Sequence, residues 1–276
     1  IDASGTEKSV SALTIDDLKN YYNQYFSPSV STFLVAGDIE KSRVERALAS
    51  LNKNWTAKKV EVPTFTLPAA PAKSQIYFVD VPGAKQSVIS IGAPGLPRTN
   101  PDFYAATVAN YKLGGSFNGI FNLILREEKG FTYGARSNFS GGKSTGSFVA
   151  SSKVRTNSTL ESVTIFKTEM ERYRQEIPQE YVDFTQSALM KGNALRFETL
   201  GDLIGMIRNI SSYNLPFDYI KKEETFLKEL TPGKLRDYAV KYIDPAKMYY
   251  VVVGDAATQL KELEKVGLGE PVLIKN

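Results

Sequence analysis

The chain has 276 residues, of which 34 are Lys or Arg and 30 are Asp or Glu, so its formal net charge is +4. So small an excess gives no reason to expect a nucleic-acid partner, which would need a clustered basic face. The sequence contains no cysteine and no histidine. This excludes disulfide frameworks, zinc fingers, cysteine nucleophiles, Ser–His–Asp triads and histidine-bound metals.

No apolar run reaches the roughly 18 to 20 residues that a membrane-spanning helix needs, so we expect no membrane span. The densest apolar run covers only residues 249–253. The chain begins at Ile1, with polar residues after it and without the features of a signal peptide. We therefore expect it to be an excised or processed piece of something longer.

An internal repeat organises the sequence. Residues 13–38 (LTIDDLKNYYNQYFSPSVSTFLVAGD) align without a gap with residues 230–255 (LTPGKLRDYAVKYIDPAKMYYVVVGD), at an offset of 217 positions (230 minus 13). By chance, only about one or two identities would be expected over such a length. A period this long indicates a duplicated domain and not a solenoid repeat. The identities include Leu13/Leu230, Thr14/Thr231, Leu18/Leu235, Tyr21/Tyr238, Tyr25/Tyr242, Pro28/Pro245, Gly37/Gly254 and Asp38/Asp255.

Each copy predicts a helix, a buried strand, a Gly–Asp turn and a second helix. Thr14 or Thr231 can cap the first helix, and Pro28 or Pro245 can end it. In the first copy, residues 33–36 form the expected strand. The repeat also predicts equivalent buried places for two pairs of residues, Leu18 with Leu235 and Tyr25 with Tyr242.

The repeat leads to an expected domain organisation. Almost nothing precedes the first copy, so residues 1–60 are expected to be the C-terminal remnant of a preceding homologous domain. Residues 61–72 carry three prolines and are expected to form an extended linker. Residues 73–276 are expected to form a complete domain that ends with the second copy.

Within that domain, strands are followed by helices and then by the helix and strand of the second copy. This order predicts an α+β fold, with helices covering a mostly antiparallel or mixed sheet. Expected strands cover residues 75–81 and 86–91, joined by a Pro82–Gly83 turn, and residues 131–139 and 146–151, joined as a hairpin. Expected helices cover residues 102–113, 116–128, 158–176, 179–198 and 200–213.

Two familiar kinds of site are not supported. Residues 142–144 (GKS) resemble the end of a phosphate-binding loop, but Ser137 stands where that motif needs glycine, and a strand is expected to follow. Without His or Cys, zinc would need an all-carboxylate site, which is atypical. We therefore assign neither a metal nor a cofactor to this chain.

Residues 113–136 (LGGSFNGIFNLILREEKGFTYGAR) are the most informative stretch. A helix is expected to end at Gly130, and a strand to follow. The turn could bring Arg126 and Tyr133 to one rim, where both could donate hydrogen bonds to a peptide carbonyl or an oxyanion. The structural alternative is that Arg126 favours the helix C-terminus and Tyr133 packs in the sheet.

The same stretch resembles the C-terminal domain signature of the pitrilysin/insulinase family of zinc metallopeptidases, which includes two-subunit processing peptidases. The matching residues are Leu125, Arg126, Glu127, Gly130, Phe131 and Tyr133. The repeated Leu-Thr…Tyr…Pro…Gly-Asp segment resembles the segment that closes each homologous domain of that family.

The resemblance implies homologous α+β domains, like those of the mitochondrial processing peptidase, that close around a peptide as a clamshell. It implies that zinc is bound by an inverted His-x-x-Glu-His motif elsewhere, in the parent chain or a partner subunit, since this chain has no histidine. It implies that Tyr133 donates to the scissile carbonyl or its oxyanion, and that Arg126 holds substrate backbone carbonyls.

Two function classes stay open. The first is the non-zinc-binding part of a zinc endopeptidase, whose partner is an N-terminal zinc-binding domain or a catalytic subunit and whose substrate is a peptide. The second is a catalytically inactive homologue acting as a scaffold or partner subunit. In both cases the chain alone is expected to be inactive. The resemblance favours a bacterial periplasm or cell envelope but leaves the compartment open.

Overall fold

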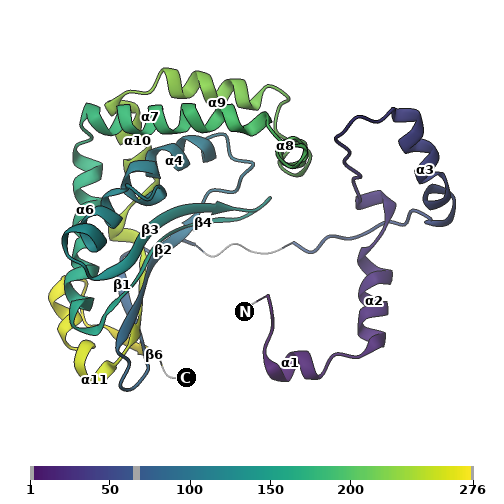
Figure 1. Cartoon of the computed structure of the whole chain (residues 1–276). Coiled ribbons are helices and arrows are strands. Elements are labelled where there is room, and N and C mark those ends of the chain that lie inside the picture. Colours follow the sequence, from purple (N-terminus) through teal and green to yellow (C-terminus); the bar gives the residue numbers. More distant parts are fainter. Residues whose placement is uncertain (1–2, 65–68, 275–276) are drawn as a thin grey trace. The chain divides into compact units, whose positions relative to one another are not determined.

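The computed structural model describes residues 3–64 and 69–274 of the chain (Figure 1). The chain divides into two compact units, which are described separately. Unit 1 comprises Ile1–Thr66 and Phe197–Ser211, and unit 2 comprises Leu67–Arg196 and Ser212–Asn276. Residues 65–68, inside the expected linker, lie outside the described residues.

Unit 2 is built on a six-stranded mixed sheet with the order β3-β4-β2-β5-β1-β6. The expected α+β fold, with helices over a mixed sheet, is confirmed. The strands are β1 (Gln75–Asp80), β2 (Gln86–Gly95), β3 (Thr132–Gly141), β4 (Gly146–Arg155), β5 (Tyr249–Gly254) and β6 (Val272–Ile274).

The position of β5 was not predictable from local sequence. It pairs parallel with β1 and antiparallel with β2, so the strands on either side of the Pro82–Gly83 turn are not neighbours. The expected hairpin of β3 and β4 is confirmed, and β4 also pairs antiparallel with β2. The chain must therefore return from residue 249 to complete a sheet that begins at residue 75.

Helices cover one face of this sheet (Figure 1). Alternate strand residues such as Phe78, Ile89 and Val252 point into the core between the sheet and these helices, and they are fully buried. Residues of opposite parity, such as Val88 and Val251, are only half-buried. One-sided burial of this kind leaves an open sheet face in unit 2. The helices of unit 2 are α4 (Phe103–Asn110), α5 (Ile120–Asn122), α6 (Thr159–Gln175), α7 (Gln179–Ala194), α9 (Tyr219–Lys228), α10 (Pro232–Tyr242) and α11 (Ala256–Gln259).

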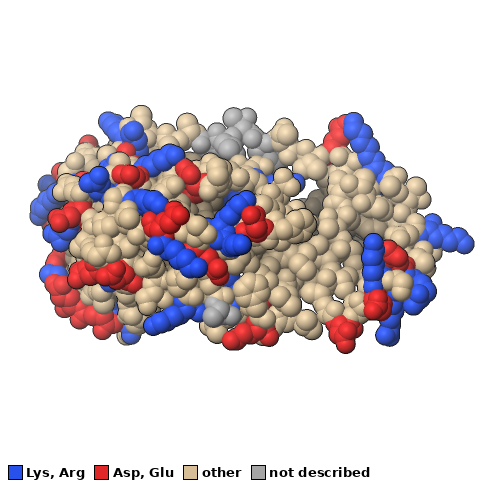
Figure 2. Space-filling model, turned by 90° about the horizontal axis from the view of Figure 1, so that it is seen from above, with Lys and Arg blue, Asp and Glu red and all other residues tan. Residues whose placement is uncertain are grey.

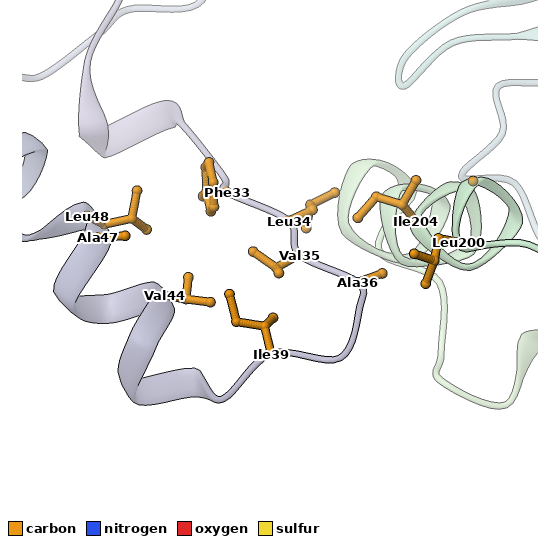
Figure 3. A pocket seen from close by; sticks show the side chains of 11 residues that line it. Phe33, Leu34, Val35, Ala36, Ile39, Val44, Ala47, Leu48, Leu200 and Ile204 are labelled. Carbon is orange, nitrogen blue, oxygen red and sulfur yellow. The ribbon is translucent and has the colours of Figure 1, made fainter.

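Unit 1 is helical and has little core. Its helices are α1 (Glu7–Ser11), α2 (Ile15–Tyr25) and α3 (Lys41–Asn54), together with most of α8 (Leu200–Tyr213). No residue of α1, α2 or α3 is buried. The extended residues 33–36 run between α3 and α8, with Val35 lying toward Val44 and Leu34 toward Ile204 (Figure 3).

The local structure of the two repeat copies agrees with the prediction. Thr14 caps α2 by accepting a hydrogen bond from the Asp17 N–H, and Thr231 caps α10 in the same way from Lys234. Short 3₁₀ turns begin at Pro28 and at Pro245 after the two helices.

The expected burial of the first copy is wrong. Residues 33–36 are extended but belong to no sheet among the described residues, whereas the equivalent residues form β5. Leu18 is 57% exposed, whereas Leu235 is fully buried, and Tyr25 and Tyr242 are both half-buried. The reason is that burial depends on the sheet, and unit 1 offers no paired strands in its described part.

Within residues 3–64 and 69–274, no helix combines the length and the apolar character needed to cross a bilayer.

An ionic contact joins α4 to the closing helix α10 and generates a testable prediction. The Asp102 carboxylate accepts hydrogen bonds from the Lys241 ammonium, at 2.7 Å, and from the Tyr242 hydroxyl, at 2.5 Å. These two donors hold the pKa of Asp102 below its ordinary value. Its contribution to stability is therefore complete above the unfolded pKa near 4 and is lost as the pH falls through the lower folded pKa.

We expect Asp102→Asn to lower the free energy of unfolding by about 1 kcal/mol at pH 7, since the carboxylate is partly exposed. The difference from wild type should shrink below pH 4. Urea unfolding between pH 3 and 7 measures it, with the exposed Asp237→Asn as the control. A difference that stays constant over this range would contradict the assignment.

Candidate functional site

A cavity of about 670 Å³ lies against the open sheet face of unit 2. Strands β2, β3 and β4 form its floor, and the loop between α4 and α5 forms one wall. The lining includes Tyr133, Arg136 and Lys153 from the hairpin and Phe117 from the loop. Unlike an ordinary sheet surface, this region combines a concave shape with several converging polar groups, as ligand sites do.

A β-bulge in β3 forms the centre of the site. Thr132 pairs with Val154 and Ala135 pairs with Ser152, so two residues of β3 face a single residue, Lys153, on β4. The two residues are Tyr133 and Gly134. Bulges of this kind re-aim a side chain and are over-represented beside active sites.

Four hydrogen bonds hold the bulge and link it to the cavity wall. The Thr132 hydroxyl accepts from the Gly134 N–H, and the Ser152 hydroxyl donates to the Gly134 carbonyl at 2.9 Å. From below, the buried Asn122 accepts from the Ala135 N–H at 3.1 Å and donates to the Phe117 carbonyl at 2.9 Å. Asn122 thus ties the bulge to the loop that forms the cavity wall.

The bulge turns Tyr133 outward. Its side chain is 93% exposed while it lines the cavity, so Tyr133 does not pack in the sheet. A side chain held out by its backbone, with its hydroxyl free to meet a ligand, can donate a hydrogen bond to a carbonyl or an oxyanion.

Arg126 lies before the turn and is not part of the cavity lining. As expected, the helical segment ends at Gly130, which has φ +62°. The N–H of Gly130 donates to the Arg126 carbonyl and that of Phe131 to the Leu125 carbonyl, so two carbonyls at the helix end find partners. The Arg126 guanidinium lies 4.7 Å from the centre of the Phe117 ring, which lines the cavity, and 3.3 Å from a carboxylate oxygen of Glu127.

The two predicted site residues differ in their relation to the cavity, because Tyr133 is part of its lining and Arg126 is not. No hydrogen bond joins Arg126 to Tyr133 in the described part of the chain. Tyr133 lines the cavity directly, whereas Arg126 borders it through the ring of Phe117.

A close approach of backbone to backbone fixes the cavity wall. A Cβ added at Gly114 would lie 2.4 Å from the Ser137 hydroxyl and 2.7 Å from the Ser137 nitrogen, so only glycine fits there. Beside it, buried Asn110 donates to the Ser137 carbonyl at 2.8 Å and accepts from the Ser137 hydroxyl at 2.5 Å. These contacts seat the loop on β3.

The residues present do not fit a metal. The sequence has no His or Cys, and the described residues contain no cluster of three acidic groups that could hold an ion. The cavity lining contributes Arg136 and Lys153 but no Asp or Glu. A cation would meet only repulsion there.

Unit 1 has a cavity of about 550 Å³, lined by apolar residues of the extended segment, α3 and α8 (Figure 3). Its lining contains no titratable or nucleophilic side chain. The cavity of unit 1 therefore offers no catalytic or charged group, and we take the cavity of unit 2 as the candidate functional site.

Sequence reasoning missed the residues that build the site around Tyr133. Asn122, Thr132 and Ser152 hold the bulge, and Arg136 and Lys153 supply its charge. One signal was present in the sequence, because an isolated glycine inside a strand pattern, here Gly134, often marks a bulge.

The role of Asn122 can be tested by its removal. Asn122→Ala leaves the Ala135 N–H and the Phe117 carbonyl without their partner, and buried groups in that state cost about 1 to 3 kcal/mol. We expect a loss of stability of that size in urea unfolding. Asn118→Ala is the matched control, because Asn118 is exposed on the same loop. Equal urea midpoints of unfolding for Asn122→Ala and Asn118→Ala would contradict the prediction.

Comparisons with known proteins agree with this architecture. An uncharacterized zinc protease of Streptomyces coelicolor is 24% identical over 208 residues, which cover 74% of this chain and 45% of that protein. The non-peptidase homolog YmxG of Helicobacter pylori is 21% identical over 258 residues, covering 92% and 58%. The chain thus spans about half the length of the relatives it matches.

Among solved structures, a peptidase M16 inactive domain from Pseudomonas fluorescens superposes with a TM-score of 0.82 at 23% identity. The match covers 92% of this chain and 61% of that one, and shows a shared fold. A family profile described as the peptidase M16 inactive domain matches residues 12–189, well over half of the chain. The chain therefore belongs to the inactive-domain family of the M16 peptidases, the pitrilysin-like zinc proteases and their homologues.

Proposed function

We propose that this chain is the non-zinc-binding, C-terminal part of a pitrilysin/insulinase-type zinc metalloendopeptidase. In this proposal it completes a peptide-binding clamshell and donates Arg126 and Tyr133 to the substrate backbone. The observation that carries the proposal is the exposed Tyr133, held outward by the bulge over a cavity of ligand size.

The chemistry assigned to Tyr133 is hydrogen-bond donation to the scissile carbonyl as negative charge develops on its oxygen. A hydrogen bond from a preorganised donor stabilises the transition state more than the ground state, because the oxygen gains negative charge. The donor is already in place, so no free energy is spent on reorienting it during the reaction. The four hydrogen bonds around the bulge support such preorganisation.

The role assigned to Arg126 is to hold carbonyls of the substrate backbone. Its guanidinium lies over the Phe117 ring, which limits its freedom, and its terminal NH₂ groups have no hydrogen-bond partner among the described residues. A stacked, half-exposed arginine of this kind can present donors to an extended peptide.

Zinc, in this proposal, is bound outside this chain, in an N-terminal domain of the same parent protein or in a catalytic partner subunit. Relatives named zinc proteases support a zinc-dependent parent, and the lack of ligands here requires that its zinc be held elsewhere. The chain alone is then inactive, and its partner is another M16 domain.

We also propose the domain organisation. Residues 1–60 are the end of a preceding homologous domain, 61–72 a linker and 73–276 the complete domain. The exposed apolar residues of α2 support this, because they match residues that α10 buries in unit 2.

One of the relatives supports a second candidate function, that of an inactive scaffold or partner subunit. The H. pylori protein, matched over 92% of this chain, carries the name non-peptidase homolog. If the whole protein lacks a zinc motif, the same fold serves as a scaffold or partner subunit, and the cavity becomes a peptide-binding site without chemistry.

The catalytic role of Tyr133 is tested by Tyr133→Phe in the enzyme reconstituted with its zinc-bearing partner. Removing one oxyanion donor costs about 2.7 to 4 kcal/mol, so turnover should fall roughly 100- to 1000-fold. The melting temperature should stay unchanged, because the Tyr133 side chain is exposed and its hydroxyl makes no hydrogen bond among the described residues. Tyr22→Phe, at an exposed tyrosine of α2, is the control.

Arg126→Ala should lower turnover and weaken peptide binding together, because contacts to backbone carbonyls exist in both ground and transition states. Wild-type turnover in Tyr133→Phe would end the catalytic assignment and leave the scaffold function.

The domain proposal predicts a preferred site of proteolysis. Brief digestion with a nonspecific protease should cut first within residues 61–72 and leave the sheet of unit 2 protected. Mass spectrometry of the early fragments identifies the cuts. First cuts inside α6 or β5, with residues 61–72 intact, would contradict the linker.

A further inference from the structure

Resting on the proposed function, we infer that the cavity selects peptides that carry a carboxylate close to the bond held at Tyr133. The specificity-determining residues are Lys153 and Arg136. The ligand chemistry is a peptide carboxylate, either an acidic side chain or a free C-terminus.

Strand register places the two cations side by side. Arg136 on β3 pairs with Ser151 on β4, and Lys153 lies two residues beyond Ser151 on the same strand. Arg136 and Lys153 are therefore diagonal neighbours, with backbones about 7 to 8 Å apart. Both side chains are exposed and line the same cavity, so both face the open side of the sheet.

These two charges are not compensated within the fold. Neither side chain makes an ion pair or a hydrogen bond among the described residues, whereas Arg126 and Lys129 pair with Glu127 and Glu161. The cavity lining supplies no Asp or Glu. On the face of unit 2 seen in Figure 2, by contrast, basic and acidic side chains are interspersed. Two like charges held this close favour an anion between them.

Neutral polar groups complete the site. Ser116 lines the cavity, and its hydroxyl is buried without a hydrogen-bond partner among the described residues. A buried hydroxyl without a partner costs free energy that a polar ligand can recover. Ser90 and Ser151 lie on the same face between the cations and the centre of the sheet.

The position of the carboxylate follows from the bulge. Tyr133 faces Lys153 directly across the strand pair, and Arg136 lies three residues further along β3. Since an extended peptide rises about 3.3 Å per residue, a carboxylate held by Lys153 sits within about two residues of the bond at Tyr133. Lys153 and Arg136 can therefore select a negatively charged group. Val88, which pairs with Lys153, offers only apolar contact.

The test uses the full chain and fluorescein-labelled, amidated ten-residue peptides of Ala and Ser with one central Glu, or Gln in its place. Fluorescence anisotropy at low salt should give about three- to tenfold tighter binding of the Glu peptide, the range expected for exposed ion pairs. The preference should shrink at high salt. A third peptide, the Gln form with a free C-terminal carboxylate, distinguishes the two sources of the anion.

Lys153→Gln and Arg136→Gln should each reduce the preference, while Lys143→Gln should keep it. Lys143 is a matched control because it is exposed on the same hairpin, outside the cavity, and carries the same charge. Lys153→Glu should reverse the preference toward a peptide with a central Lys. This reversal separates recognition of charge from any loss of folding.

Equal binding of the Glu, Gln and free-carboxylate peptides would overturn the inference, and so would a preference that survives both cavity variants. If those peptides bind equally while Tyr133→Phe still abolishes turnover, the specificity is wrong and the proposed function stands. If no peptide binds at millimolar concentration, the inference is overturned, and the proposed function is then judged by the turnover of Tyr133→Phe in the reconstituted enzyme.

Discussion

The structure depends on the insertion of β5 between β1 and β2. The strands β1 and β2 do not pair with each other, and each pairs with β5, which lies between them. Residues about 170 positions apart in the chain must therefore meet before the sheet of unit 2 is continuous. Tyr250 and Val252 then fill the centre of the core. Pairing of strands so far apart in the sequence costs the entropy of closing a long loop. The sheet, and the site on its open face, therefore form only when the whole of unit 2 folds.

The same constraint explains the difference between the repeat copies. Caps, helix lengths and proline turns are encoded within about a dozen residues, so α2 and α10 agree closely. Burial is not encoded locally, because Leu235 is buried in a domain with a sheet, whereas the described residues of unit 1 contain no sheet to cover Leu18. The first helices of the two copies therefore share one local form but lie in two solvent environments. In the proposed domain organisation, the exposed face of α2 is what a preceding domain would cover.

This also marks how far the sequence could predict the site. The helix stop at Gly130 and the hairpin of β3 and β4 follow from local rules. Strand order and the bulge do not, because they depend on partners such as Asn122 and Ser152 that become neighbours only in the folded sheet. The exposure of Tyr133 could not be derived from alternation along β3, since that pattern breaks where the strand bulges.

The break in alternation is what gives the site its chemistry. Tyr133 and Arg136 are three residues apart, an odd spacing that places side chains on opposite faces of a regular strand. The extra residue in the bulge shifts the parity, so that both are exposed while Ala135 between them is buried. A regular β3 would bury one of the two groups and leave the other alone. The bulge thus brings a hydrogen-bond donor and a charged group onto one face, which is why the proposed catalytic and specificity roles share a single hairpin.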